Sequence, residues 1–227
     1  MNTPLDFHTH HSNRIDSGIL CMSPCEVVPC VEQSAKVLLS VGIHPWSTEN
    51  VSEMELKRQV AMLSEVAMLP QVVAIGETGL DSLRGGPIDV QEQLLMTHIA
   101  VSEHVKKPLV LHVVKQYNRV LELRKRLLPN LSQPWILHGF RGKPQLASQL
   151  LASSVPQSMV YISLGAQFNV QTARLIPADN LLAETDESTS LITDIIAQIA
   201  YARGESASTI SAIIFQNVQR VIAPGIV

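Results

Sequence analysis

Histidines and carboxylates at strand ends are the residues of this sequence whose types and positions could do chemistry. His8, Glu77, His112, His138 and Asp186 each lie at the carboxyl end of a predicted strand or within two residues of it. Between Glu77 and Asp186 they are separated by one or two repeats of a βα pattern. In a parallel barrel the carboxyl ends of the strands form one mouth. We therefore expect these five side chains to converge there.

A sixth residue joins this set through the H-x-H pair of His8 and His10. Alternate residues at a strand end share a face, so both imidazoles can bind one ion. Imidazoles combined with carboxylates suit Zn²⁺, Mn²⁺, Ni²⁺ or Fe²⁺, and the carboxylates also allow Mg²⁺. Six ligands exceed one tetrahedral shell, so we predict two divalent ions, held by His8, His10, Glu77, His112, His138 and Asp186.

Short β-rich runs alternate with longer amphipathic stretches along the chain, which is typical of a parallel sheet built from βα units. The clearest helical patterns are 53–68, 90–105 and 117–128, and two more, 191–201 and 208–222, close the outer ring. The predicted strands lie near residues 5–8, 18–22, 36–42, 72–76, 109–112, 135–138, 160–163 and 181–184. Eight such strands predict a (β/α)8 TIM barrel.

The length of 227 residues is slightly short for this fold, which typically takes about 250. Only residues 9–17 separate the first two predicted strands, too few for a helix of normal length. We expect a reduced first crossover. No linker, repeat or shift in composition marks a second domain, so we interpret residues 1–227 as one hydrolase barrel.

Composition excludes several other classes of protein. Hydrophobic residues make up 46% of the chain, which argues against disorder, and the net charge of −3 gives no global attraction to nucleic acid or anionic membranes. The spacing of Cys21, Cys25 and Cys30 matches neither a zinc knuckle nor a C-x-x-C pair, which favours reduced thiols. The sequence shows no secretory signal and no apolar run long enough for a membrane helix, so we expect a cytoplasmic protein.

Six motifs, in this order, resemble the TatD family of metal-dependent deoxyribonucleases, within the amidohydrolase-like barrels. They are D-F-H-T-H at 6–10, G-I-H-P at 42–45, A-I-G-E-T-G-L-D at 74–81, P-L-V-L-H at 108–112, L-H-G-F-R-G at 137–142 and L-L-A-E-T-D at 181–186. The resemblance implies a dinuclear site in which Glu77 bridges two ions. His8, His10 and Asp186 would complete one shell, while His112 and His138 would hold the other ion.

Candidate substrate contacts lie close to these ligands. His44, at the end of the third strand, resembles a family position near the substrate; its alternative is to rigidify the loop beside Pro45. Valines follow His112 where the family usually has an arginine, so a lysine could substitute as a point charge only. The basic candidates for phosphate contacts are Arg84, Lys115, Arg141 and Lys143.

Other polar residues have structural interpretations. We expect Asp81 to orient a ligand or its turn rather than to bind metal. His98 and His104, six residues apart in a predicted helix, are expected at the surface. The basic run of Arg119, Arg124, Lys125 and Arg126 is expected to be a solvated helix face.

The predicted reaction is metal-assisted hydrolysis of DNA phosphodiester bonds by an activated water, with Asp186 as proton acceptor and Glu77 as the shared ligand. One alternative is a hydrolase of a small phosphoester or amide, favoured by the near-neutral isoelectric point and the missing arginine. A second is a degenerate, non-catalytic barrel, which the complete ligand set disfavours. No obligate protein partner is evident from the sequence.

Overall fold

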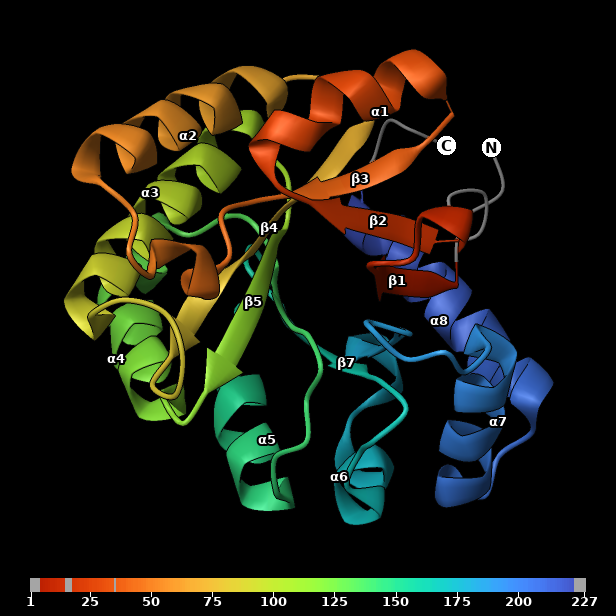
Figure 1. The fold of residues 1–227 in the computed structure, drawn as a ribbon. Helices are drawn as coiled ribbons and strands as arrows, with labels where there is room; N and C mark the ends of the chain where they lie inside the picture. Colours follow the sequence, from red (N-terminus) through yellow and green to blue (C-terminus); the bar gives the residue numbers. More distant parts are fainter. Residues whose placement is uncertain (1–4, 15–17, 35, 223–227) are drawn as a thin grey trace.

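The computed structural model describes residues 5–14, 18–34 and 36–222, and its centre is an eight-stranded parallel sheet. The strands follow sequence order around the sheet, from β1 to β8, and each pairs in parallel with the next (Figure 1). Their bounds are β1 Asp6–Thr9, β2 Gly18–Met22, β3 Leu38–Val41, β4 Val72–Asp81, β5 Leu109–Val114, β6 Trp135–Leu137, β7 Val160–Leu164 and β8 Leu181–Ala183. The TIM-barrel prediction is confirmed.

Helices surround the sheet, with α2, α3 and α4 on one side and α7 and α8 on the other (Figure 1). Helix α3 shows why the sequence forms them, because its buried residues recur every three or four positions, as on the inner face of an amphipathic helix. The helices described are α1 Val27–Gln33, α2 Glu53–Val66, α3 Ile88–Val105, α4 Tyr117–Leu127, α5 Pro144–Leu151, α6 Val170–Leu175, α7 Ile192–Arg203 and α8 Ala207–Ile222.

The first crossover is reduced, as predicted. Between β1 and β2 the described residues form only a short 3-10 turn, Ser12–Arg14, and no α-helix. The two strands nevertheless pair in parallel, with Asp6 opposite Gly18 and Thr9 opposite Leu20. The connection is therefore shorter than the dozen or more residues usual for parallel strands.

The barrel closes between β1 and the segment that follows β8. The backbone N–H of Asp186 donates to the carbonyl of His8 at 2.9 Å, and the N–H of His10 donates to the carbonyl of Asp186 at 3.2 Å. Thr9 and Asp186 thus form an isolated parallel bridge. Closure therefore brings the backbone of Asp186 against the H-x-H pair.

Strand β4 is longer than the predicted 72–76 and includes Glu77, which the sequence analysis placed after the strand end. Its register against β5 shifts between Ile75 and Thr78, around Glu77. The flanking Gly76 and Gly79 have φ of +139° and +144°. A Cβ on Gly79 would lie 2.0 Å from the carbonyl oxygen of His112, so this approach of β4 to β5 requires glycine.

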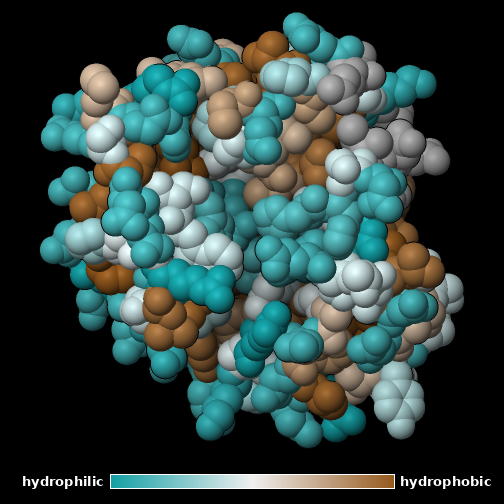
Figure 2. Space-filling view, in the orientation of Figure 1, coloured by the Kyte–Doolittle hydropathy of each residue, from teal (hydrophilic) through white to brown (hydrophobic). Residues whose placement is uncertain are grey.

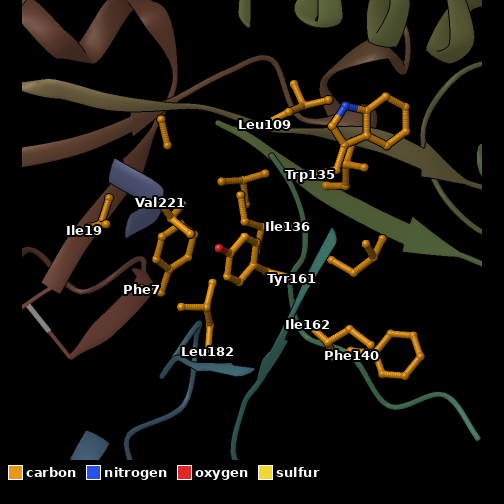
Figure 3. Close-up of a cluster of buried hydrophobic side chains, with 14 of the residues drawn as sticks. Phe7, Ile19, Leu109, Trp135, Ile136, Phe140, Tyr161, Ile162, Leu182 and Val221 are labelled. Carbon is orange, nitrogen blue, oxygen red and sulfur yellow. The ribbon is translucent and has the colours of Figure 1, made fainter. Parts of the chain in front are cut away.

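Buried apolar side chains of the strands and helices form one continuous core. Phe7 of β1, Tyr161 of β7 and Val221 of α8 lie together in it (Figure 3).

Arg124 also belongs to the interior, which corrects the expectation of a solvated basic face. Its guanidinium is 4.9 Å from the centroid of Trp135 and donates to the Ser158 carbonyl at 2.5 Å, while burial lowers its pKa to about 10.

The rest of that basic run is more exposed, as predicted. Lys125 and Arg126 are exposed, and Arg119 pairs with Asp89 and Glu92.

Among the described residues, none of the helices combines the length and the apolarity that crossing a bilayer requires. Hydrophilic residues cover much of the face shown in Figure 2, including the surroundings of a hollow near its centre.

Candidate metal centre

Glu77 lies in the middle of a ring of imidazoles, and its two carboxylate oxygens face different members of the ring. Oε2 is 3.4 Å from Nε2 of both His8 and His10. Oε1 is 2.7 Å from Nε2 of His138 and 2.9 Å from Nδ1 of His112. A single buried carboxylate is thus shared by two pairs of nitrogen ligands.

Asp186 adds a second carboxylate on the side of the H-x-H pair. Its Oδ1 is 3.9 Å from Nε2 of His8 and 3.6 Å from Nε2 of His10. Its φ of +52° lies in the left-handed region, which is uncommon for a residue with a side chain. The structure thus brings all six predicted ligands into one cluster.

His8 shows that the donor set fits metal ions. The residue is fully buried, yet neither ring nitrogen makes a hydrogen bond among the described residues. A buried polar group without a partner is costly, and a metal ion would satisfy it. Donor atoms of His8, His138 and Asp186 lie within 4.8 Å of one another, and so do those of His44, Glu77 and His112.

Glu184 is a site residue that the sequence analysis did not single out. It is fully buried, and its Oε1 lies 3.3 Å from Nδ1 of His138 and accepts from the N–H of Gly139 at 2.5 Å. It fixes the ring of His138 so that Nε2 points at Glu77. Its place two residues before Asp186 in L-L-A-E-T-D is a signal in the sequence that could have identified it.

Asp81 holds His112 in the way predicted for a residue that orients a ligand. Its Oδ2 is 3.2 Å from Nε2 of His112, which leaves Nδ1 facing Glu77. The same oxygen accepts from Nε1 of Trp46 at 2.6 Å, and Oδ1 accepts from the N–H of Leu83 at 2.7 Å. Trp46 was not predicted, because a tryptophan after G-I-H-P gives no sign of where its indole points.

His44 reaches the centre of the site, with Nε2 3.0 Å from Oε1 of Glu77. Its Nδ1 also accepts from the N–H of Trp46 at 3.1 Å, so it orders the loop as well. The expectation that His98 lies at the surface is wrong. His98 is fully buried in α3, because it shares the apolar face of Leu94 and Ile99, whereas His104 is exposed as predicted.

Opposite charges at close range set the electrostatics of the cluster. Burial alone would raise the pKa of Glu77, but the charge of His138 and hydrogen bonds with His10 and His112 outweigh it, so this pKa lies well below its usual value. Burial likewise opposes the charged form of His138, but Glu77 and Glu184 raise its pKa well above the ordinary range. Burial lowers the pKa of His44. Glu77 is therefore ionised and available as a ligand.

A cavity of about 670 Å³ opens beside the cluster at the barrel mouth. His112, His138 and Asp186 lie along it, and so do three of the predicted phosphate contacts, namely Arg84, Lys115 and Arg141. The guanidinium of Arg84 is 4.4 Å from the centroid of the Trp46 ring. Lys143 is exposed at the start of α5 and does not line this cavity.

A parallel eight-stranded barrel with imidazoles and carboxylates gathered at its mouth is an arrangement suited to binding metal ions that activate water. The family model described as TatD related DNase matches residues 15–223. The chain belongs to this family, and the resemblance read from the six motifs is confirmed.

Curated relatives carry hydrolase and nuclease names. The chain is 32% identical over 167 residues to an uncharacterized metal-dependent hydrolase of Buchnera aphidicola, which covers 71% of the chain and 60% of that protein. It is 28% identical to the deoxyribonuclease Tat-D of Schizosaccharomyces pombe, with 65% and 50% covered. A 3'-5' ssDNA/RNA exonuclease TatD of Rahnella is also 28% identical, with 85% and 83% covered. The matches to the first two span less than two thirds of those proteins.

Solved structures support the fold. The YJJV TatD homolog of Escherichia coli superposes with a TM-score of 0.78 at 20% identity, covering 97% of this chain and 98% of that one. A TatD family hydrolase of Entamoeba histolytica gives a TM-score of 0.76 at 17% identity, covering 98% and 99%. At sequence identities this low, the similarity to these structures supports the barrel fold alone.

Proposed function

We propose that the protein is a deoxyribonuclease that hydrolyses phosphodiester bonds with two divalent ions. The observation that carries the proposal is the position of Glu77, whose two oxygens face separate groups of imidazoles. His8, His10 and Asp186 would hold one ion with Glu77, and His112 and His138 would hold the other. The nuclease names of the Schizosaccharomyces and Rahnella relatives support the substrate class.

The residues divide the chemistry among them. Bound divalent ions would supply Lewis acidity, which lowers the pKa of water and offsets negative charge on the attacked phosphoryl group. Asp186, whose side chain is 28% exposed and lines the cavity, would accept the proton of the attacking water. Asp81 and Glu184 keep the rings of His112 and His138 aimed at Glu77.

The basic rim favours a nucleic acid over a small phosphoester or amide. Arg84, Lys115 and Arg141 are exposed around the same cavity, where they can neutralise successive phosphates despite the net charge of −3. Glu187 also lines the cavity and opposes polyanion binding there. Asp81, the other carboxylate in the lining that is not a proposed ligand, is engaged with Trp46 and His112. Because three cations face two such carboxylates, DNA is our first choice and a small phosphoester our second.

We further propose that the protein acts in the cytoplasm and without an obligate protein partner. Three free cysteines are consistent with a reducing compartment. The identity of the two ions falls among zinc, magnesium, manganese and nickel, since the donors are imidazole and carboxylate.

The test is an assay of metal-loaded protein against single-stranded DNA, RNA, a generic phosphodiester and a set of amides. We expect turnover of single-stranded DNA by the wild type. The variants Glu77→Gln and Asp186→Asn should lose it, because one removes the shared ligand charge and the other the proton acceptor. Glu187→Gln is the matched control, since Glu187 is the carboxylate adjacent to Asp186 in the same cavity and has no proposed catalytic role.

Two results would contradict the proposal. Turnover of an amide or a small phosphoester without any cleavage of DNA would show that the protein is a hydrolase of small metabolites. Cleavage of DNA by Glu77→Gln at the wild-type rate would show that the activity comes from elsewhere on the molecule or from a contaminant.

A further inference from the structure

Cys21 is a buried thiol at the edge of the proposed metal centre. It lies in β2, where it is 9% exposed, and its partner in the register of β3 is Ser40. Its Sγ is 3.9 Å from Oε2 of Glu77 and 4.0 Å from the carbonyl of Gly76. The thiol therefore faces the same carboxylate oxygen as His8 and His10.

The four donors have the spacing of one coordination shell. Donor atoms of His8, His10, Cys21 and Glu77 all lie within 4.8 Å of one another. A tetrahedral zinc site with bonds of about 2.0–2.3 Å has edges of roughly 3.3–3.7 Å. The distances of 3.4, 3.4 and 3.9 Å from Glu77 Oε2 to the two imidazoles and the thiol come close to these edges.

His8 provides an independent sign that a ligand belongs here. Its ring is fully buried and its nitrogens make no hydrogen bond among the described residues, although Nε2 points into this group of donors. A buried imidazole without a partner is costly, so an ion is expected beside it. A cation at the centre of the four donors satisfies the imidazole and uses the thiol.

We infer that Cys21 is a thiolate ligand of the ion that His8, His10, Glu77 and Asp186 would hold, so that this position selects Zn²⁺ or Co²⁺ over Mg²⁺. The inference rests on the proposed function, and it deepens it by naming a ligand and a metal class. Binding converts the S–H group to a thiolate that bonds to the ion, and the proton is released to the buffer. Soft thiolate ligands favour zinc, whereas magnesium prefers oxygen donors.

The other metal position provides an internal contrast. His112 and His138 face Oε1 of Glu77 at that position, and among the described residues the one cysteine in a group of candidate donors is Cys21, on the Oε2 side. We therefore expect the two positions to differ in metal preference, with the thiolate position the more selective for soft ions.

The experiment uses metal-depleted full-length protein titrated with Co²⁺ and followed by absorption. A thiolate ligand gives a sulfur-to-cobalt charge-transfer band in the near ultraviolet, which nitrogen and oxygen donors lack. We expect the band in the wild type and in Cys25→Ser, a matched control with an exposed thiol, and its loss in Cys21→Ser. Zinc affinity at this position should fall at least about tenfold in Cys21→Ser, with magnesium affinity unchanged.

X-ray absorption of the zinc-loaded wild type makes the test independent of how the variant folds. It should detect one sulfur per chain at about 2.3 Å from zinc. Cobalt or zinc binding without a charge-transfer band and without a sulfur neighbour would overturn the role of Cys21 and leave the proposed function intact. Failure of any divalent ion to bind would overturn both, so the two failures are distinguishable.

Discussion

His98 accepts a hydrogen bond from the backbone N–H of Ile43, with 2.9 Å between Nε2 and the amide nitrogen. Its Nδ1 donates to the carbonyl of Leu94 at 2.8 Å, which fixes the tautomer and the direction of the ring. Ile43 directly precedes His44, whose Nε2 is 3.0 Å from Glu77. Helix α3 therefore anchors the loop that presents His44 to the proposed metal centre.

This buried imidazole gives the first prediction, a loss of stability in mild acid. Burial lowers the pKa of His98 to about 4. The unfolded chain protonates first, near pH 6.5, so the stabilisation is complete above that pH and is lost as the pH falls toward 4. The full loss is on the order of 3 kcal/mol.

Urea unfolding of metal-depleted protein between pH 7 and pH 4.5 measures this effect. In His98→Gln, which retains an acceptor for the Ile43 amide, the free energy of unfolding should depend less steeply on pH than in the wild type. His104→Gln, at the exposed histidine of the same helix, should follow the wild type. Equal slopes for all three proteins would mean that His98 does not titrate as a buried base.

The second prediction concerns Asp81, which holds His112 through Nε2. Asp81→Asn keeps the shape of the side chain but removes its charge, so the ring of His112 should be held less firmly toward Glu77. We expect metal affinity at the position of His112 and His138 to fall by about 10- to 100-fold. Isothermal titration with Mn²⁺ or Zn²⁺ measures it. Ser82→Ala, at the exposed neighbour, should bind like the wild type, and unchanged affinity in Asp81→Asn would remove the residue from the support of the site.

The third prediction separates two glycines with positive φ. At Gly204, which ends α7 with φ of +71°, an added Cβ meets nothing within 4 Å, so Gly204→Ala should cost only the backbone penalty of about 1–2 kcal/mol. At Gly79 the same methyl group would lie 2.0 Å from the His112 carbonyl, so β4 must move away from β5. Thermal unfolding should show Gly79→Ala to be destabilised by more than about 4 kcal/mol, or unable to fold. Similar melting temperatures for both variants would refute the close approach of these strands.

The sequence was sufficient to predict most of this architecture because short β-rich runs alternate with amphipathic stretches. The polar residues that end these runs must meet at one mouth of a parallel barrel. Each of the eight predicted strands overlaps an observed one, and closure through the Thr9 and Asp186 bridge brings His8, His10 and Asp186 together as their positions implied. Glu77 was predicted to lie at the barrel mouth for the same reason, although β4 runs five residues beyond the predicted end.

The residues that were missed depend on packing between elements distant in sequence. His98 and Arg124 are polar side chains in amphipathic helices, so the sequence does not show that they are buried. Each finds its hydrogen-bond partner in a segment distant in sequence. His98 accepts from the Ile43 amide, and Arg124 donates to the Ser158 carbonyl. Cys21 lies in a predicted strand, and its spacing to Cys25 gives no motif. Its approach to Glu77 arises only when β2 and β4 lie on either side of β3.

The last prediction tests the substrate through salt. In an Asp186→Asn background, which suppresses hydrolysis, a short labelled single strand of DNA should bind less tightly as salt rises, because each neutralised phosphate releases counterions. Arg141→Ala should reduce the slope of log affinity against log salt by about one phosphate, or roughly 0.7 for a single strand, since Arg141 lines the cavity beside His138 and Asp186. We expect the same change for Lys115→Ala and Arg84→Ala, and a comparison with Lys143→Ala asks whether contacts extend past the cavity. Lys125→Ala, which removes an equal charge in the last turn of α4, should leave the slope unchanged. Binding that does not respond to salt, or a slope that Lys125→Ala lowers as much as Arg141→Ala, would be incompatible with polyanion binding at this mouth and would favour a small phosphoester or amide as the substrate.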